Sequence, residues 1–471
     1  MRTAARVGAA IAALGLAATT GVASAEPAAT PAKASDFNGD GHSDLAVGGF
    51  GTWVGWMEMA GTVVVIDGSQ GRLDPRKTTV INQSSEFMSE EPRIWEEFGR
   101  TIGSGDFNGD GYADLSVSSQ ESFTYPRSGS LFLLFGSPAG LAEAVELPSP
   151  GEGKFGRRQT VGDFDNDGFA DIFASMSGTN LPLGYVIYGN AELSEPGQAD
   201  FAAVHADAAG FTAWDPGAGD VDGDGYDDLV VPRVNGTRSE VLLFRGGPNG
   251  LPERRSQRLA GGGMRTAVGD LDNDGHDDVA FGDSNVGVNG KFHAGQVKVW
   301  YGAKTGMDAK RGMTKITAAT ARIPGEPGVE SRFGDDVAIG DVNGNGRAEL
   351  AIGVPFEDIG TQSATGRAIV LYGDAKGIVP ATARIESFTQ NSPGVQSDYA
   401  NGKFFGSKLA FGDYTGDGRS ELLVKAGDFS GSVTVLNASA GGLTGVGSQM
   451  YTAKNTGIES RVPSFGEGLN K

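Results

Sequence analysis

The sequence predicts an all-β protein: a seven-bladed β-propeller closed by a C-terminal strand. Three observations predict this fold. An acidic ten-residue motif occurs seven times along the 471 residues, at spacings of 50 to 72 residues. A short apolar run follows each copy. Glycine is abundant, at 76 residues, without the Gly-X-Y period of collagen, which indicates many tight turns.

Each repeat predicts four short strands. In the second copy the motif "DFNGDGYADL" precedes the runs "LSVSS" and "GSLFLLFG", and a weaker third run precedes the next copy. A Phe-Gly pair lies eight residues before the motif in four copies, at Phe98, Phe155, Phe333 and Phe405. No segment has the pattern of an amphipathic helix. Four-stranded repeats of this length favour propeller blades over a β-solenoid, whose rungs are shorter.

The two ends of the chain predict how the ring closes. The first unit lacks its Phe-Gly strand, and Phe465-Gly466 supplies an unmatched one near the C-terminus. Closure removes strand edges that would otherwise lie unpaired. The predicted blades are 36–97 with 463–471, then 98–154, 155–208, 209–261, 262–332, 333–403 and 404–462.

The acidic motif has the donor pattern of a calcium loop. Oxygen-bearing side chains occupy positions 1, 3, 5 and 9, and glycine occupies position 6, where it permits a sharp turn. An EF-hand needs glutamate at position 12 between two helices, but here that position is apolar in loops one to five and strands are expected on both sides. Crowded carboxylates repel one another without a cation, so we predict metal sites rather than plain Asx turns.

We predict about five Ca²⁺ sites, in loops one to five, with position 7 contributing its backbone carbonyl. The predicted ligands are Asp36, Asn38, Asp40, His42, Asp44, Asp106, Asn108, Asp110, Tyr112, Asp114, Asp163, Asp165, Asp167, Phe169, Asp171, Asp220, Asp222, Asp224, Tyr226, Asp228, Asp270, Asp272, Asp274, His276 and Asp278. Loop six keeps only two carboxylates, because Asn343 and Asn345 replace aspartate, and loop seven has Thr415 at position 3. The longer glutamate at position 9 of both loops is not expected to reach the same place. Two weak or empty sites are therefore predicted, at Asp341, Asn343, Asn345, Glu349, Asp413, Thr415, Asp417 and Glu421.

The succession of Phe-Gly, acidic loop and strand resembles the FG-GAP repeat of the integrin α-subunit propeller and of secreted bacterial FG-GAP/VCBS proteins. The resemblance covers nearly all of residues 36–471. It implies seven blades, Ca²⁺ in the loops between strands one and two, and ligand binding on the opposite face. Units four and five depart from the pattern, because Phe211 is shifted and Met264 replaces the phenylalanine.

The N-terminus predicts secretion. Arg2 and Arg6 flank the start of an apolar stretch, Ala23-Ser24-Ala25 fits a cleavage site, and a Pro/Ala-rich segment follows. We therefore expect a signal peptide over 1–25, cleaved near Ala25, and a linker over 26–35. The sequence has no second long apolar stretch, so no membrane span is predicted. The absence of cysteine excludes disulfides. The net charge of −21 argues against nucleic acid as a partner.

These observations favour a secreted, monomeric, calcium-stabilised module that binds an extracellular protein or glycan ligand in adhesion. No catalytic constellation is identified. The "FGDSNVG" stretch after Ala280 falls at a repeated strand end, and His42 and His276 occupy loop position 7, which leaves His205 and His293. The 59 acidic residues leave open a carbohydrate-active enzyme, a polysaccharide lyase or a glycosidase.

The longest connections predict where a ligand binds. Connections alternate between the ends of an antiparallel blade, so the loops between strands two and three and the links to the next blade lie opposite the acidic loops. They are longest in blades one, five and six. The candidate ligand-binding residues, all from blade one, are Trp53, Trp56, Met57, Phe87, Arg93 and Trp95. The alternative is that these side chains only pack the loops onto the blade.

Overall fold

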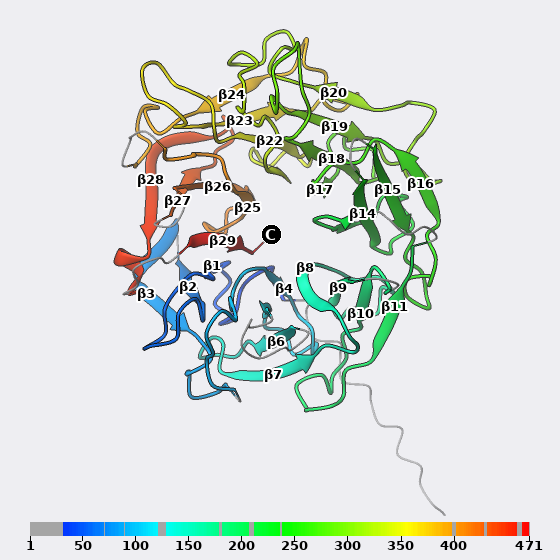
Figure 1. The fold of residues 1–471 in the computed structure, drawn as a ribbon, viewed down its shortest axis with the longest axis vertical. Helices are drawn as coiled ribbons and strands as arrows, with labels where there is room; N and C mark the ends of the chain where they lie inside the picture. The colour runs from blue at the N-terminus through cyan, green and yellow to red at the C-terminus, as the bar shows by residue number, and fades with distance from the viewer. Residues whose placement is uncertain are drawn as a thin grey trace, which may run out of the picture.

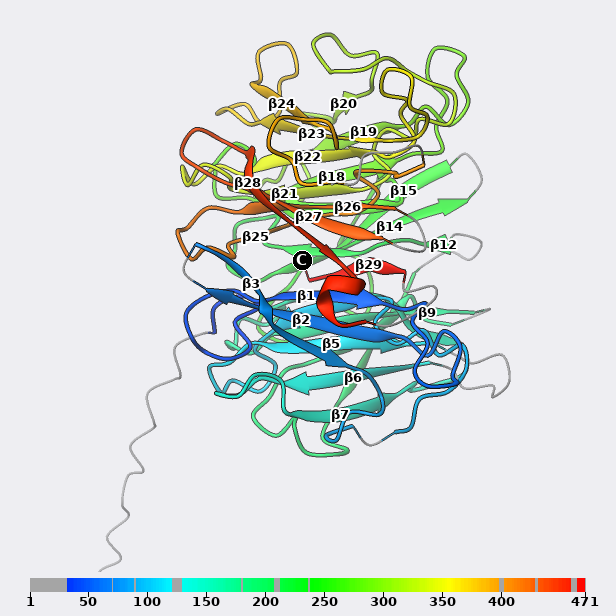
Figure 2. The ribbon, with the colours of Figure 1, turned by 90° about the vertical axis from the view of Figure 1, so that its left-hand side faces the viewer.

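The computed structural model describes residues 32–470, except 70, 89, 121–128, 179–180, 207–211, 236–237, 398–401, 428–430 and 459–463. The predicted signal peptide, residues 26–31 of the predicted linker and Phe211 lie outside the described residues. Seven antiparallel sheets surround a central axis (Figure 1). Their strands run between the two faces of the disc, as the edge-on view shows (Figure 2). The predicted seven-bladed all-β propeller is confirmed.

Within each sheet the strands are ordered from the axis outward. The first blade contains β29 (Phe465–Leu469), β1 (Leu45–Gly49), β2 (Thr62–Ser69) and β3 (Arg72–Ile81). The second contains β4 (Ile102–Gly105), β5 (Asp114–Ser119), β6 (Ser130–Phe135) and β7 (Glu143–Pro148). The third contains β8 (Lys154–Gly162), β9 (Asp171–Ser177), β10 (Gly184–Ile187) and β11 (Phe201–Val204). The fourth contains β12 (Thr212–Ala213), β13 (Gly217–Gly219), β14 (Asp228–Asn235), β15 (Arg238–Phe244) and β16 (Gln257–Ala260).

The remaining three blades follow the same order. The fifth contains β17 (Arg265–Gly269), β18 (Asp278–Asp283), β19 (Gln296–Trp300) and β20 (Thr314–Ile316). The sixth contains β21 (Val337–Gly340), β22 (Glu349–Val354), β23 (Arg367–Tyr372) and β24 (Ile385–Phe388). The seventh contains β25 (Leu409–Gly412), β26 (Glu421–Ala426), β27 (Ser432–Asn437) and β28 (Thr444–Thr452), and a short 3₁₀ helix, η1 (Lys454–Thr456), follows it.

In five of the seven blades a Phe-Gly pair joins the blade to the one before it. Phe98 is fully buried in the core between blades one and two, and its ring meets Phe132 edge-on at 5.6 Å. Gly99 has a φ of 84°, and a Cβ there would lie 2.6 Å from the carbonyl oxygen of Thr62 in β2. Only glycine allows this backbone approach at positive φ. The same burial and positive φ recur at Phe155-Gly156, Phe333-Gly334, Phe405-Gly406 and Phe465-Gly466.

The second and third strands of each blade are buried on both faces by their neighbours. All residues of β5, β6 and β22 are buried, for example. A strand with no solvent face needs apolar residues at successive positions, which explains the continuous runs in the sequence. The core is therefore a series of apolar layers, each shared by two adjacent blades.

Closure of the ring is provided by β29. It pairs antiparallel with β1, Val47 facing Leu469 and Gly48 facing Gly468. The buried amide of Asn470 accepts a hydrogen bond from the N–H of Ala46 at 3.1 Å, and it donates to the Asp44 carbonyl at 3.1 Å and to the Ser35 hydroxyl at 2.7 Å. The prediction that the C-terminal strand completes blade one is confirmed.

We expect deletion of residues 465–471 to expose the edge of β1 and the core that Phe465 fills. The truncated protein should aggregate or lose its cooperative thermal transition, measured by circular dichroism and size-exclusion chromatography. Asn470→Ala, which removes three hydrogen bonds, should lower the free energy of unfolding by about 2–3 kcal/mol. A truncated protein that melts like the full chain would show that β29 does not close the ring.

Candidate functional site

The seven acidic loops share one backbone structure, on one face of the disc. The aspartate at position 1 accepts hydrogen bonds from the N–H groups of positions 5 and 6. In loop three, Asp167 N lies 3.2 Å from Asp163 Oδ1 and Gly168 N lies 3.1 Å from Asp163 Oδ2. Gly168 has a φ of 92°. The glycine at position 6 therefore allows one carboxylate to cap the turn.

The carboxylate at position 9 ties each loop to its blade. Asp114 accepts hydrogen bonds from the N–H of Phe107 at 2.8 Å and from that of Gly136 at 2.8 Å. Burial raises the pKa of Asp114 to about 8. Burial likewise raises the pKa of this residue to about 8 in loops three to five, and to about 7 in loops one, six and seven. The sequence analysis missed this backbone role, because Gly136 is distant in sequence.

The glutamates of loops six and seven make the equivalent contact. Glu349 accepts a hydrogen bond from Val342 N at 2.7 Å, and Glu421 accepts one from Tyr414 N at 3.0 Å. The longer glutamate therefore does reach the position-2 amide, and the weak or empty cation sites in loops six and seven stay a prediction. Loop six differs from the others by having asparagine at both positions 3 and 5, whereas loop seven has Thr415 at position 3 and keeps Asp417 at position 5.

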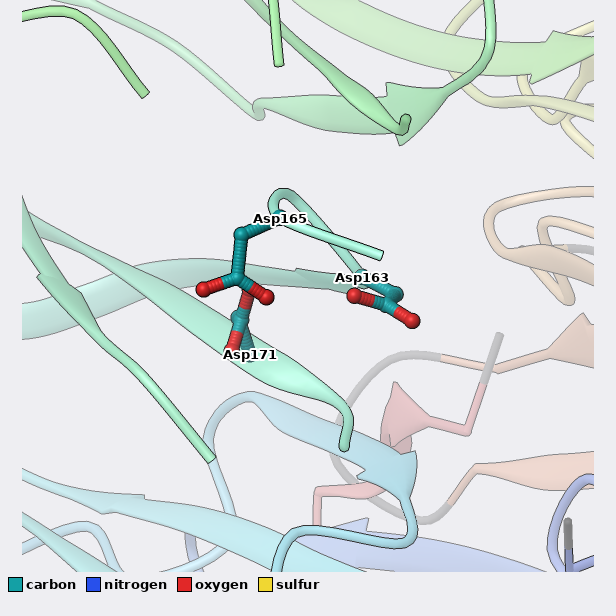
Figure 3. Close-up of side chains that lie close together, drawn as sticks. All are labelled: Asp163, Asp165 and Asp171. Carbon is teal, nitrogen blue, oxygen red and sulfur yellow. The ribbon is translucent and has the colours of Figure 1, made fainter. Parts of the chain in front are cut away.

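Loop three brings three carboxylates together. Oxygen atoms of Asp163, Asp165 and Asp171 lie within 4.8 Å of one another, in the arrangement that Figure 3 shows. Asp165 Oδ1 is buried and has no hydrogen-bond partner among the described residues. Burial and the charges of Asp167 and Asp163 raise the pKa of Asp165. A divalent cation would reduce the repulsion among these carboxylates and give Asp165 Oδ1 a partner, so this donor set is compatible with Ca²⁺.

Loops four and five form similar clusters, but each has an arginine beside it. Oxygen atoms of Asp220, Asp222 and Asp224 lie within 4.8 Å of one another, as do those of Asp270, Asp272 and Asp278. Arg245 forms an ion pair with Asp222, and Arg311 Nη1 donates to Asp272 Oδ2 at 2.8 Å. An ion in these loops would meet a nearby guanidinium, which the position-by-position sequence comparison did not reveal.

Loops one and two carry asparagine at position 3. Asn38 Oδ1 accepts from Asp40 N at 2.9 Å, and Asn108 Nδ2 donates to Asp110 Oδ2 at 3.0 Å. The end of the predicted linker also contacts loop one, since Lys33 donates to the Gly41 carbonyl and forms an ion pair with Asp413 at 3.3 Å.

The side chain at position 7 bridges neighbouring loops. The Tyr112 ring covers Gly39, where a Cβ would lie 2.6 Å from the ring, and the Phe169 ring covers Gly109 in the same way at 2.4 Å. His276 packs against Gly223, and His42 against Gly416. These residues were predicted as carbonyl donors; their side chains in addition link the loops into a ring.

On the opposite face, the longest loops form small hairpins. In blade one Val54 and Met57 exchange two backbone hydrogen bonds, so that Gly55 and Trp56 form the tip. Blades five and six have the same hairpin, at Val288–Lys291 and Ile359–Gln362. The link to the next blade braces each hairpin through backbone bonds, such as Trp95 N to the Glu58 carbonyl at 2.8 Å.

The candidate ligand residues divide into two groups. Trp56 is 91% exposed and Met57 is 37% exposed. Trp53, Phe87, Arg93 and Trp95 are partly buried: Phe87 packs against the core, and Arg93 pairs with Glu90 and Glu96. The sequence analysis missed two further exposed apolar side chains of blade five, Phe292 (60%) and Val329 (62%).

The residues considered for catalysis lie apart from one another in the repeats. Ser284 of the "FGDSNVG" stretch is buried. His205 lies 4.0 Å from Glu253, and His293 Nδ1 lies 3.1 Å from Glu330 Oε2 with its ring stacked on Phe292. Each of these two histidines therefore lies beside a different glutamate.

Comparison with known families agrees with this architecture. The FG-GAP repeat model matches residues 98–134, 333–371 and 405–436, and the FG-GAP-like repeat model matches 163–231 and 220–281. The chain carries FG-GAP repeats. Among the described residues, no helix has the length and apolar character that crossing a membrane requires.

Curated relatives match parts of the FG-GAP repeat region. Integrin alpha pat-2 of Caenorhabditis elegans is 30% identical over 236 residues, which is 46% of this chain and 18% of that protein. Phosphatidylinositol-glycan-specific phospholipase D of Mus musculus is 28% identical over 158 residues, 33% of this chain and 17% of that protein. The matches thus span less than a fifth of either relative. A crystal structure of a Lactobacillus plantarum protein aligns with 91% of this chain and 99% of its own, at 12% identity and a TM-score of 0.47.

We expect Ca²⁺ to raise the melting temperature and EGTA to lower it. A site with a dissociation constant of about 10⁻⁴ M adds about 1.4 kcal/mol at about 1 mM Ca²⁺. For a chain of this size that corresponds to about 1–2 °C per site. Scanning calorimetry in both conditions measures the difference.

Asp165→Asn tests loop three directly, because it removes charge without changing shape. In EGTA it should melt at or above the wild-type temperature, since it relieves repulsion with Asp163 and Asp167. In Ca²⁺ it should lose the increment of one site, whereas Asn345→Ala in loop six should retain most of the Ca²⁺-dependent difference. An identical melting temperature with Ca²⁺ and EGTA would contradict the metal sites.

Proposed function

We propose that this FG-GAP propeller is a secreted, calcium-stabilised binding module that recognises an extracellular protein or glycan through the hairpin face, in adhesion. The observation that carries the proposal is Trp56, which lies 91% exposed at the tip of a hydrogen-bonded hairpin. Tryptophan is a frequent anchor of interfaces, and exposed apolar side chains that cluster mark interaction sites.

The surroundings of Trp56 support a recognition surface. Met57 of the same hairpin and Ile94 of the bracing link are each 37% exposed. The C-terminal side of the hairpin is held by the link to the next blade, because Gly61 pairs with Phe98 and Trp95 N bonds to the Glu58 carbonyl. A rigid apolar tip loses little conformational entropy on binding. In this proposal the acidic loops, on the other face, bind Ca²⁺ and stabilise the disc as a monomer.

The predicted signal peptide supports an extracellular location, where free Ca²⁺ reaches the millimolar range that loops of this kind need. The FG-GAP repeats and the integrin relatives are consistent with a binding role. Their names apply to much longer proteins, so the ligand has to be found by experiment.

A glycan array and a panel of extracellular matrix proteins, probed with 1 mM Ca²⁺ and with EGTA, would identify the ligand. Trp56→Ala should then weaken binding at least tenfold with an unchanged melting temperature, because its side chain is almost fully exposed. Trp53→Ala and Trp95→Ala should reduce both binding and stability, since these side chains are partly buried.

Lys154→Ala is the matched control, because this exposed residue begins β8 on the same face but away from the hairpins. Equal loss of binding in Trp56→Ala and Lys154→Ala would remove the case for the hairpin surface. Cleavage of an array polysaccharide by the wild-type protein would instead favour the carbohydrate-active enzyme.

A further inference from the structure

The central channel contains a cavity of about 430 Å³. Its walls come from the innermost strands of several blades, including β4, β8, β17, β25 and β29. Five basic side chains line it, Arg100, Arg157, Arg158, Arg265 and Lys408, against two acidic ones, Asp215 and Glu467. The protein as a whole carries 59 acidic and 38 basic residues, so the cavity reverses the sign of the surrounding charge.

Both acidic side chains of the wall are already paired. Asp215 accepts from Arg158 Nε at 2.8 Å and from Arg265 Nη1 at 2.7 Å, so one carboxylate is shared by two guanidinium groups. Glu467 pairs with Lys425 at 2.6 Å. Arg100 pairs with Glu97 outside the wall, at 2.5 Å. Asp335 and Asp336 also attract Arg265 but do not line the cavity, so the lining side chains by themselves keep a surplus of positive charge.

Lys408 carries part of that surplus. Its ammonium group makes no hydrogen bond or ion pair with the side chains that the structure describes, although Asp336, Asp215 and Glu467 attract it from further away. Burial and the charge of Arg265 lower the pKa of Lys408. Lys408 is partly exposed, to the channel that it lines, and a bound anion there would stabilise its charge.

Two other donors of the wall lack a partner within the described part of the chain. One is the hydroxyl of Thr266, a residue that is 6% exposed. The other is the buried indole Nε1 of Trp214. The guanidinium carbon of Arg158 lies 4.7 Å from the centre of the Trp214 ring. Buried donors in proteins are almost always satisfied. An unmet hydroxyl, an unmet indole N–H and an ammonium without a direct partner thus belong to residues that line one cavity, and a ligand with acceptor oxygens would offer them a partner.

The charged and apolar residues occupy different depths. Arg158, Asp215, Arg265 and Lys408 all lie five residues before the acidic loop of their blade, near the hairpin face. Val161, Val268, Ile339 and Phe411 lie two residues before it and line the deeper part. We infer that the central channel is a binding site for a small organic carboxylate, whose oxygens meet Lys408, Thr266 and Trp214 while its apolar body fills the deeper part.

Hexanoate is a suitable probe, with hexan-1-ol as its neutral analogue and sodium chloride as the control for ionic strength. Isothermal titration calorimetry at saturating Ca²⁺ should show saturable binding of one hexanoate per chain, and a matching rise in melting temperature. Hexan-1-ol should bind at least tenfold more weakly, because it carries no negative charge for the basic side chains of the cavity to attract.

Lys408→Met keeps the length of the side chain and removes the charge, and should weaken hexanoate binding at least tenfold. Thr266→Val, which removes one hydroxyl at constant shape, should weaken hexanoate binding severalfold. This variant provides the test if Lys408→Met folds poorly. Lys291→Met, at an exposed lysine of the blade-five hairpin, should bind as the wild type does. Absence of saturable binding, equal binding of hexan-1-ol, or unchanged affinity in both cavity variants would overturn the inference.

Discussion

Every blade depends on closure of the ring. The second and third strands of a blade have no solvent face of their own, because the adjacent blades bury them on both sides. An open ring would expose two apolar sheet faces and an unpaired strand edge at once. The pairing of β29 with β1, secured by the buried amide of Asn470, removes both. The Phe-Gly pairs repeat the same device between blades: the phenylalanine fills the shared core, and the glycine lets the backbones approach.

The two faces of the disc differ in structure and in the role that we assign to them. On one face the acidic loops have nearly invariant backbones, since one aspartate caps each turn and a second carboxylate ties it to the blade. Position-7 side chains such as Tyr112 connect each loop to the next. On the other face the connections differ between blades, and among the residues that the structure describes this is where exposed aromatic tips such as Trp56 and Phe292 occur. A stable face built from repeats thus supports a variable face that is free to acquire a ligand.

The sequence predicts the fold well because each repeat records its own strands, loop and Phe-Gly pair. It predicts less of the site, because the deciding contacts join residues far apart in sequence. Nothing in the acidic motif shows that Arg311 reaches Asp272, or that Gly136 donates to Asp114. The sequence also does not show that Trp56 is exposed while Trp95 is partly buried, since both lie in long loops of one blade. The charge inside the channel is equally hidden, because its charged residues come from several blades that are far apart in the sequence.

The account rests on the acidic loops being cation sites rather than self-sufficient turns. The most direct test is a high-resolution crystal structure of the protein grown in CaCl₂, with anomalous scattering to identify the ions. We predict a Ca²⁺ ion in loop three, about 2.3–2.6 Å from oxygens of Asp163, Asp165 and Asp171, and weaker or no density in loops six and seven. Water molecules in place of an ion in loop three, with the loop unchanged, would contradict the account.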